Sequence, residues 1–474
     1  MAVVRLSGPI SGKILRGLTS ADQALPEPRR PALRTLFDPA SGGALDQALV
    51  TVFKRPESYT GEDAVEITCH GGVLGPDLIV QACVQLGARV AEPGEFTRRA
   101  YLNGRMDLLE AEGVADLVES RSVVRRQVAV SQMEGGLSAR IAEARSAVID
   151  LEAQLVHHLD FPMEDDAPVP MEVIAAAAEA LADCLDGLAA TAPGGLLLRE
   201  GAMVVFAGRP NAGKSSLFNA ILGESRAIVT SEPGTTRVAA EAGVSLDGFP
   251  FRLVDTGGLR DPTGEVERLG IEVARRYVEG ADLVLYCLEA DRAAGPEDME
   301  FLQALPSVPR VVARTRSDEV SVTVESGLTE GDGAPVEVSV SALSGVGLDR
   351  LKEVLKETAF AAVVAALQEE APVITRERQV RKVRGAAKEI RDIAKAFGGG
   401  VPGEDASAHL KSAETLLEEM LGEGTGEGVK GIAVEVHLHD PVADGFADLG
   451  HRGTRSAVKD EVETVGVLSE ALAD

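Results

Sequence analysis

Residues 202–222 read AMVVFAGRPNAGKSSLFNAIL, which is an apolar run, a glycine-containing turn and a helix-forming run. The turn from Gly208 to Ser215 has the spacing GxxxxGKS. Its glycines let successive backbone N–H groups curl around a phosphate, and the following helix adds its N-terminal dipole. Lys214 is placed to reach the β- and γ-phosphates, and the Ser215 hydroxyl to bind Mg²⁺. The pattern predicts a P-loop rather than an ordinary glycine-rich turn.

Four later segments predict that the bound base is guanine. GTTR ends at Arg237 in a loop at the spacing of a switch region, and DTGG begins at Asp255 after the strand-like run FRLV. An aspartate at that strand end can hold Mg²⁺ through water, and the last glycine N–H can sense the γ-phosphate. TRSD ends at Asp318, whose carboxylate can accept from guanine N1–H and the 2-amino group, which adenine does not offer. SAL begins at Ser341, where a backbone N–H would meet guanine O6.

These segments together define the predicted GTP site. TRSD departs from the usual Asn-Lys-x-Asp by Thr for Asn and Arg for Lys, so its order and spacing carry the assignment. The site consists of Asn211, Ala212, Gly213, Lys214, Ser215, Ser216, Thr230, Ser231, Glu232, Pro233, Gly234, Thr235, Thr236, Asp255, Thr256, Gly257, Gly258, Thr315, Arg316, Ser317, Asp318, Ser341, Ala342 and Leu343.

The residue after DTGG bears on the hydrolysis mechanism. Ras-like enzymes carry a water-orienting Gln there, whereas this chain has Leu259, which cannot orient water. Glu265 and Glu267 are the nearby carboxylates that remain as alternatives, and Arg260 is available for charge stabilisation. Each of these side chains is equally well explained as a solvated loop charge on sequence alone.

Composition limits the class of protein. The 474 residues exceed one ordinary core, so we expect about two to four domains. A net charge of −28 argues against a broad basic surface that would bind nucleic acid without a partner. The four cysteines form no CxxC pair, which favours free thiols over disulfides or zinc. No leader and no uncharged run of about 18 residues are apparent, so we expect a cytosolic protein.

The order of patterns predicts the organisation of the chain. Short apolar runs and turns indicate a mixed α/β domain over 1–103, and helical periodicity dominates 104–198. Strands then alternate with helices over 199–362, which is typical of a mostly parallel sheet. Helical sequence returns over 363–474, although no continued helix is expected beyond about residue 422. We therefore expect a nucleotide domain inserted into a helical one.

The motifs resemble those of the bacterial and organellar tRNA-modification GTPase MnmE (TrmE) family over residues 1 to about 420. The likeness rests on SYTGEDAVEITCHGG, AEPGEFTRRAYLNGRMDLLEAEGVADL, GRPNAGKSSLFNAILG, EPGTTR and DTGGLRDPTGEVERLGIE. It implies an N-terminal α/β domain for folate binding and dimerisation, and a helical domain interrupted by a P-loop GTPase domain. The family acts with the flavoprotein MnmG to add an aminomethyl-type (carboxymethylaminomethyl) group to carbon 5 of the wobble uridine of certain tRNAs.

The resemblance also implies site residues and cofactors. A 5-formyl or methylene tetrahydrofolate would be bound by Arg5, Glu66 and Arg105, the last being Lys in most of the family. Mg²⁺ would be held by Ser215 and Thr236, and K⁺, in the role of an arginine finger, by Asn211, Thr230, Glu232 and Thr235. The water-positioning glutamate corresponds to Glu267. The resemblance implies that the chain forms a homodimer. It also implies two partners, MnmG and a tRNA that is held mainly by MnmG.

Departures from the family pattern leave a second hypothesis open. Val238 stands where an Asp follows GTTR, a strand expected before Met1 is missing, and no cysteine follows Cys287 where the family ends in Cys-x-Gly-Lys. The alternative is a GTPase switch in ribosome assembly or regulation without modification chemistry. The folate-type N-terminal block argues against that alternative.

Overall fold

The computed structural model describes residues 1–72, 74–160, 169–224, 240–256, 277–305, 308–320, 324, 327–328, 335–399, 403–422 and 433–438. Contacts divide the chain into two compact units. The first contains residues 1–115 and 421–474, and the second contains residues 116–420. The last described segment, residues 433–438, therefore belongs to the same unit as the first described residues.

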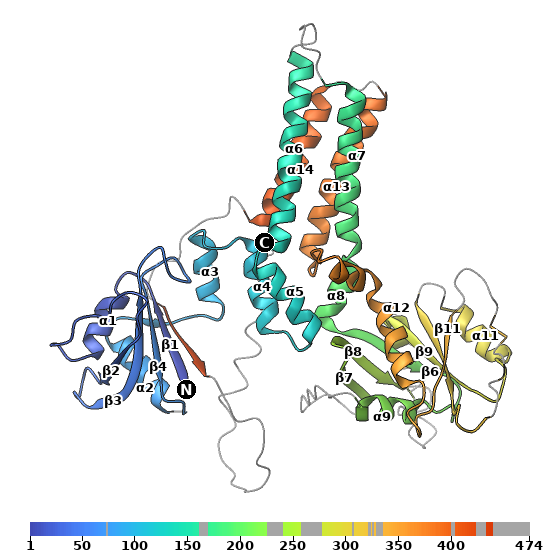
Figure 1. The fold of residues 1–474 in the computed structure, drawn as a ribbon, viewed down its shortest axis with the longest axis horizontal. Helices are drawn as coiled ribbons and strands as arrows, with labels where there is room; N and C mark the ends of the chain where they lie inside the picture. The colour runs from blue at the N-terminus through green and yellow to red at the C-terminus, as the bar shows by residue number, and fades with distance from the viewer. Residues whose placement is uncertain are drawn as a thin grey trace, which may run out of the picture. The chain divides into compact units, whose positions relative to one another are not determined.

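The first unit is a six-stranded sheet with helices (Figure 1). Its elements are β1 (Ala2–Ser7), α1 (Ser11–Leu18), β2 (Ala32–Phe37), β3 (Ala44–Phe53), β4 (Ala64–Cys69), α2 (Leu74–Gln85), β5 (Arg89–Val90), α3 (Glu95–Leu102) and β12 (Ala433–Leu438), with α4 (Leu108–Val118) crossing into the second unit. The strand order is β2-β3-β4-β1-β12-β5. Alternate residues of β1 and β4, including Leu6 and Ile67, are fully buried with Ile14 of α1 and Ile79 of α2. This alternation is the pattern of strands with one face on a core.

Strand β12 was not anticipated from sequence. It lies between β1 and β5, antiparallel to β1 with Leu6 opposite Val434, and parallel to β5. The run AVEVHL has the β-branched alternation of a strand, but nothing local tells which sheet it joins. A segment more than 400 residues away in sequence thus occupies the edge of β1 that β4 leaves open.

Long helices of the second unit form an elongated bundle (Figure 1). The helices outside the sheet are α5 (Val123–Met133), α6 (Gly136–Asp160), α7 (Met171–Ala190), α8 (Ala192–Glu200), α13 (Glu377–Gly399) and α14 (Gly403–Leu421). Helix α13 packs along α7, and α6 packs on both α5 and α7. Arg391 of α13 pairs with Asp183 of α7 at 2.7 Å. Arg145 of α6 pairs with Glu414 of α14 at 3.5 Å, so α6 and α7 from before the sheet share one bundle with α13 and α14 from after it.

The sheet of the second unit has the order β11-β10-β9-β6-β8-β7. Its elements are β6 (Ala202–Ala207), α9 (Lys214–Glu224), β7 (Ala240–Leu246), β8 (Phe249–Asp255), β9 (Leu283–Glu289), α11 (Pro296–Gln303), β10 (Arg310–Thr315), β11 (Val336–Ser339) and α12 (Leu348–Gln368). Five strands are parallel, and β7 joins β8 as an antiparallel hairpin through Asp247-Gly248. Both residues have positive φ, as a two-residue hairpin turn requires.

Apolar packing holds this sheet between its helices. Phe249, Phe251 and Phe360 form an aromatic cluster with ring centroids 5.0 and 5.4 Å apart, joining β8 to α12. Helix α12 is kinked at Phe360, which is fully buried. The expected fold class is confirmed: an N-terminal α/β domain, a helical domain, and an inserted domain with a mostly parallel sheet.

Candidate nucleotide-binding site

The P-loop leaves the central strand β6 and enters α9 at Lys214. Gly208 has φ 130°, and a Cβ there would lie 2.4 Å from the Cys287 carbonyl oxygen of β9. Gly213 also has positive φ, at 82°, and Asn211 has φ 63°, which is uncommon outside glycine. The loop therefore has the tight left-handed turns that direct consecutive N–H groups toward a phosphate.

The phosphate end of the site brings together Lys214 and the end of β8. Lys214 is 9% exposed, and its Nζ donates to the carbonyls of Gly208 at 2.9 Å and Arg209 at 2.7 Å. Asp255 is 3% exposed at the end of β8, opposite Phe206 of β6. The Thr256 hydroxyl donates to the Phe206 carbonyl at 2.7 Å. The predicted lysine and aspartate thus lie at one edge of the sheet.

The residues at this edge fit a Mg²⁺ ion bound with a nucleotide. Ser215 is exposed in the first turn of α9, and Asp255 ends β8; the hydroxyl and the carboxylate are both hard oxygen donors. Within the described ranges, no three His, Cys, Asp or Glu side chains are grouped as metal ligands. A hydroxyl and a carboxylate suit an ion that also takes phosphate oxygens and water, as Mg²⁺ does.

The predicted base-recognition segments also meet the P-loop. Thr315 Oγ1 donates to the Ala212 carbonyl at 2.9 Å, and Arg316 Nη2 donates to the Asn211 carbonyl at 2.8 Å. The Ser317 N–H donates to the Val340 carbonyl at 3.2 Å, which holds TRSD against the segment after β11. The unusual Thr and Arg of TRSD therefore hold the P-loop backbone directly.

The last predicted segment forms a turn beside TRSD. Ser341 is fully buried, and its Oγ accepts from the N–H groups of Leu343 at 3.2 Å and Ser344 at 3.1 Å. Asp318 is exposed, so its carboxylate is open to a ligand. The structure thus places the described P-loop, Asp255, TRSD and SAL residues around one end of the sheet.

Several predicted residues lie outside the described part of the chain. These are Thr230, Ser231, Glu232, Pro233, Gly234, Thr235, Thr236, Gly257, Gly258 and Glu267. The alternatives Arg260 and Glu265, together with Leu259 and Val238, also lie there. Their assignments stay predictions.

A pair of residues at the site was missed by sequence reasoning. Arg209 of the P-loop donates from Nε to Asp298 Oδ1 of α11 at 2.9 Å. Asp298 is 1% exposed, although it lies in a helix that reads as polar. A buried carboxylate needs such partners. Neither the distance of 89 residues nor the local pattern signals the contact.

The predicted folate residues lie in the first unit. Arg5 of β1 faces Glu66 of β4 across the sheet, and Arg5 Nε donates to Glu66 Oε1 at 3.0 Å. Arg105 packs over Gly61, where a Cβ would lie 3.0 Å from Arg105 Cγ. The structure therefore pairs Arg5 with Glu66 and packs the Arg105 side chain against Gly61 in the loop that precedes β4.

A buried ion-pair network adjoins this loop and was not predicted. Arg99 of α3 is 1% exposed and donates to Glu95 Oε1 at 2.8 Å and to Glu62 Oε2 at 2.9 Å. Ser7 donates to the same Glu62 oxygen at 2.7 Å. Burial raises the pKa of Glu95, but hydrogen bonds from Arg89, the Glu92 N–H and Arg99 outweigh it and lower the pKa to about 2. The network ties α3 to β1 and to the loop before β4.

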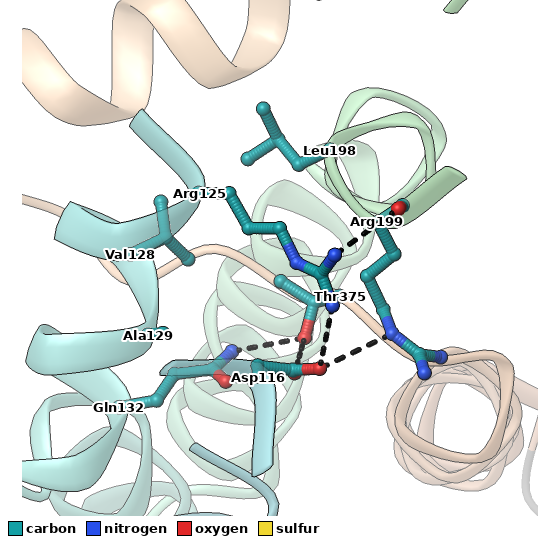
Figure 2. Close-up of a pocket in the computed structure, with 8 residues that line it drawn as sticks. All are labelled: Asp116, Arg125, Val128, Ala129, Gln132, Leu198, Arg199 and Thr375. Atoms are coloured by element: carbon teal, nitrogen blue, oxygen red, sulfur yellow. Dashed lines mark hydrogen bonds and ion pairs between the residues drawn. The ribbon is translucent and has the colours of Figure 1, made fainter. Parts of the chain in front are cut away.

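A small enclosed hollow in the second unit has a structural role (Figure 2). The buried carboxylate of Asp116 lies among Arg125, Arg199 and Thr375, as the dashed lines in Figure 2 show. Arg376 adds a hydrogen bond to Asp116 Oδ1 at 3.0 Å. These side chains pair with one another across α4, α5, α8 and the start of α13. We assign this cluster, named the Asp116 cluster below, to stability rather than ligand binding.

A membrane-spanning role finds no support in the helices. None of those in the described part of the chain combines the length and the apolar character needed to cross a bilayer.

A P-loop on a mostly parallel sheet, with an Asp at the next strand end and base-recognition loops on the P-loop backbone, defines a GTPase domain of the P-loop class. Family models extend this class assignment. The model described as GTP-binding protein TrmE N-terminus matches residues 1–105, and the MnmE helical domain model matches residues 108–429. The chain belongs to the MnmE/TrmE family of tRNA modification GTPases.

Relatives named tRNA modification GTPase MnmE match along nearly the whole chain. That of Laribacter hongkongensis is 39% identical, with 91% of this chain and 94% of the relative covered. That of Bacillus subtilis is 34% identical, with 90% and 94% covered. Among solved structures, the G domain of the T. maritima FeoB iron transporter is 28% identical over 33% of this chain and 98% of that one, at a TM-score of 0.25.

Proposed function

We propose that this protein hydrolyses GTP to drive modification of the wobble uridine of certain tRNAs. The observation that carries the proposal is the meeting of the P-loop, Asp255 and TRSD at one end of the sheet in a member of the MnmE/TrmE family. Acting with MnmG, it would help to add a carboxymethylaminomethyl group to carbon 5 of the uridine. The protein would work in the cytosol as a homodimer, with the tRNA held mainly by MnmG because this chain is strongly acidic.

The described residues divide the work of GTP binding. Lys214 leaves the Gly208 and Arg209 carbonyls and donates to the β- and γ-phosphates, while the P-loop N–H groups bind the β-phosphate. Asp318 accepts from the guanine N1–H and 2-amino groups. Ser215 and Thr236 would hold Mg²⁺, which neutralises phosphate charge when bound. Most of the rate enhancement then comes from positioning and electrostatics.

Water positioning and K⁺ form the second part of the proposal. Leu259 has no group that orients water, so we assign this role to Glu267. Asn211, Thr230, Glu232 and Thr235 would hold K⁺, whose charge would offset that developing between the β- and γ-phosphates. The left-handed backbone of Asn211, with Arg316 on its carbonyl, supports a fixed position for this ligand.

The first unit would bind the one-carbon donor. Arg5, Glu66 and Arg105 are the residues we assign to a 5-formyl or methylene tetrahydrofolate. The side chains of Arg5 and Glu66 are each 36% exposed, so both are accessible to a ligand. Dimerisation through this unit would follow the family.

GTPase rate in K⁺ compared with Na⁺ tests the mechanism. We expect hydrolysis to be faster in K⁺ by about tenfold or more, on the scale of a removed charge-stabilising interaction. Equal rates would contradict the K⁺ assignment.

Glu267→Ala should slow hydrolysis by about 100-fold or more and leave GTP affinity within about twofold, with Glu265→Ala as the matched control. An equal loss of binding would show that the role of Glu267 is wrong.

Nucleoside analysis of tRNA tests the biological function. The gene is introduced into a bacterial strain that lacks its own MnmE, and wobble nucleosides are quantified by mass spectrometry. Restored modification is the expected result, with Lys214→Ala as the inactive control. Intact GTPase activity without any restored modification would favour the alternative, a GTPase switch in ribosome assembly or regulation.

A further inference from the structure

Asp298 is a buried residue that holds Arg209 at the start of the P-loop. Gly208 and Arg209 are called the P-loop arm below. The Asp298 carboxylate accepts from Arg209 Nε at 2.9 Å and Tyr286 Oη at 2.6 Å on Oδ1. On Oδ2 it accepts from Arg292 Nη2 at 3.0 Å and the Gly295 N–H at 2.7 Å. Burial raises the pKa of Asp298, but the hydrogen bonds from Tyr286, Arg209 and the Gly295 N–H outweigh it and lower the pKa to about 2. The carboxylate is therefore a fully engaged anion at neutral pH.

The chain makes room for this contact. Arg209 immediately follows Gly208 at the start of the P-loop, and its guanidinium lies against the turn before α11. A Cβ on Gly295 would lie 2.8 Å from Arg209 Nη2, so a larger residue there would displace the guanidinium. Glu297, 3.4 Å from the same nitrogen, adds a second carboxylate. The turn and helix α11 thus form a docking site for one P-loop side chain.

The same arginine also contacts the phosphate-binding lysine. The Arg209 carbonyl accepts from Lys214 Nζ at 2.7 Å, and the Gly208 carbonyl accepts from it at 2.9 Å. The side chain of Arg209 is therefore held by α11, while its backbone holds Lys214. Movement of Arg209 would change where Lys214 is held before the phosphates arrive.

We propose that Asp298 is a positioning residue for GTP binding, which acts by anchoring Arg209 and so holds the P-loop arm in the conformation that accepts the phosphates. The proposal rests on GTP binding at the P-loop, as proposed above. Without the contact to Asp298, the P-loop arm samples conformations that do not bind phosphate. The apparent affinity for GTP then falls in proportion to the fraction of molecules whose arm remains competent to bind. Turnover of bound GTP is preserved, because neither Asp298 nor Arg209 is placed at the reacting atoms.

A double-mutant cycle on the full-length protein tests the proposal. Asp298→Asn and Arg209→Met are measured alone and together, for KM and kcat with GTP and for Kd with a fluorescent GDP. Each single variant should raise KM and Kd about tenfold, the scale of one charge-assisted hydrogen bond, with kcat within about twofold. The double variant should be no worse than the worse single variant, because both act through one contact. Arg209→Lys should recover part of the affinity.

Two controls separate positioning from stability. Tyr286→Phe removes one donor to Asp298 but keeps Arg209 in place, so KM should stay within about twofold. Asp282→Ala removes the acceptor of the hydrogen bond from the Met203 N–H, which is 2.8 Å long and lies at the end of the sheet away from the P-loop. It should lower Tm without changing KM.

Two outcomes would overturn the proposal. One is additive effects of Asp298→Asn and Arg209→Met on KM. The other is a lower Tm for Asp298→Asn with unchanged KM, which would make the contact merely structural. Failure of the unaltered protein to bind GTP would instead contradict the proposed function.

Discussion

Gly208 shows how closely single residues of the P-loop are constrained by the strand beside them. Its φ of 130° is strained for any residue with a Cβ, and the nearest atom to an added Cβ is a backbone oxygen of β9. A backbone atom in a buried strand cannot move away cheaply. The position therefore requires glycine for two independent reasons.

Gly208→Ala should abolish measurable GTP binding. The added methyl group would lie 2.4 Å from the Cys287 carbonyl oxygen, so the P-loop arm must shift by more than a side-chain adjustment. Gly223→Ala is the matched control, because no atom of the described residues lies within 4 Å of a Cβ there in α9, and the helix should gain up to about 1 kcal/mol. Titration with a fluorescent GDP and thermal unfolding measure the two effects. Normal binding by Gly208→Ala would contradict the described packing.

Glu95 gives a pH dependence whose sign follows from its lowered pKa. The folded-state pKa of about 2 lies below the ordinary value of 4.5, so the ionised form is favoured by folding. The resulting stability is present above about pH 4.5 and is lost as pH falls toward 2, by about 3 kcal/mol in all. Glu95→Gln should remove this dependence.

Hydrogen exchange of α3 amides, read by mass spectrometry between pH 6 and about pH 2.5 and corrected for the intrinsic rate, measures this effect. Glu57→Gln is the control, because Glu57 is 68% exposed in its pair with Arg29 and should change little. The same acid dependence in Glu95→Gln as in the unaltered protein would rule out Glu95 as its source.

Helices far apart in sequence are joined by the Asp116 cluster. Arg125 of α5, Arg199 of α8 and Arg376 before α13 converge on one carboxylate at the end of α4. Arg199 lies three residues before β6, the strand that carries the P-loop. The cluster thus connects the helices on both sides of the inserted domain to the strand from which the nucleotide site is built.

Asp116→Ala should destabilise the second unit by about 3 kcal/mol, because it removes the buried carboxylate that Arg199 and Arg376 share, whereas Arg125 keeps its pair with Glu119. Urea unfolding of the full chain, followed by circular dichroism, measures the loss. Asp349→Ala is the control, since Asp349 is 99% exposed in its pair with Lys352 and should change stability by less than about 1 kcal/mol. Equal transitions for both variants would show that the cluster contributes little.

On the scale of the whole molecule, the first and the last described strands, β1 and β12, lie in the same unit. Strand β12 pairs along all six residues of β1, on the edge that β4 does not use. An unpaired β1 would leave a row of backbone N–H and C=O groups open in the middle of the sheet. The second unit is continuous from residue 116 to 420 and does not include this strand.

Truncation after residue 422 should expose β1 and leave GTP binding intact. We expect β1 amides to lose hydrogen-exchange protection and the protein to self-associate through the open edge. Truncation after residue 438 keeps β12 and is the matched control. Exchange mass spectrometry, light scattering and GDP titration are the readouts. Unchanged protection of β1 in the shorter chain would contradict the observed pairing.

Local sequence was sufficient for much of this protein. The glycine spacing of the P-loop, the apolar strand before it and the helix after it are dictated by neighbouring residues, so their type and place were predictable. The alternation of strands and helices likewise predicted a mostly parallel sheet within helices, and the motifs predicted the family. Short patterns that each carry their own chemistry also selected Lys214, Asp255, Thr315 and Ser341 as candidate GTP-site residues, and the structure brings these to one end of the sheet.

Contacts between distant segments were decided by the tertiary structure alone. Asp298 meets Arg209, Arg99 meets Glu62, Asp116 gathers its arginines, and β12 fills the edge of β1. Each contact satisfies a buried charge or an open strand edge, and such a requirement can be met by many residues of suitable type. Local periodicity carries no information about which partner is chosen. That choice follows from how the packed elements bring the P-loop arm to α11 and the chain's last described strand to its first.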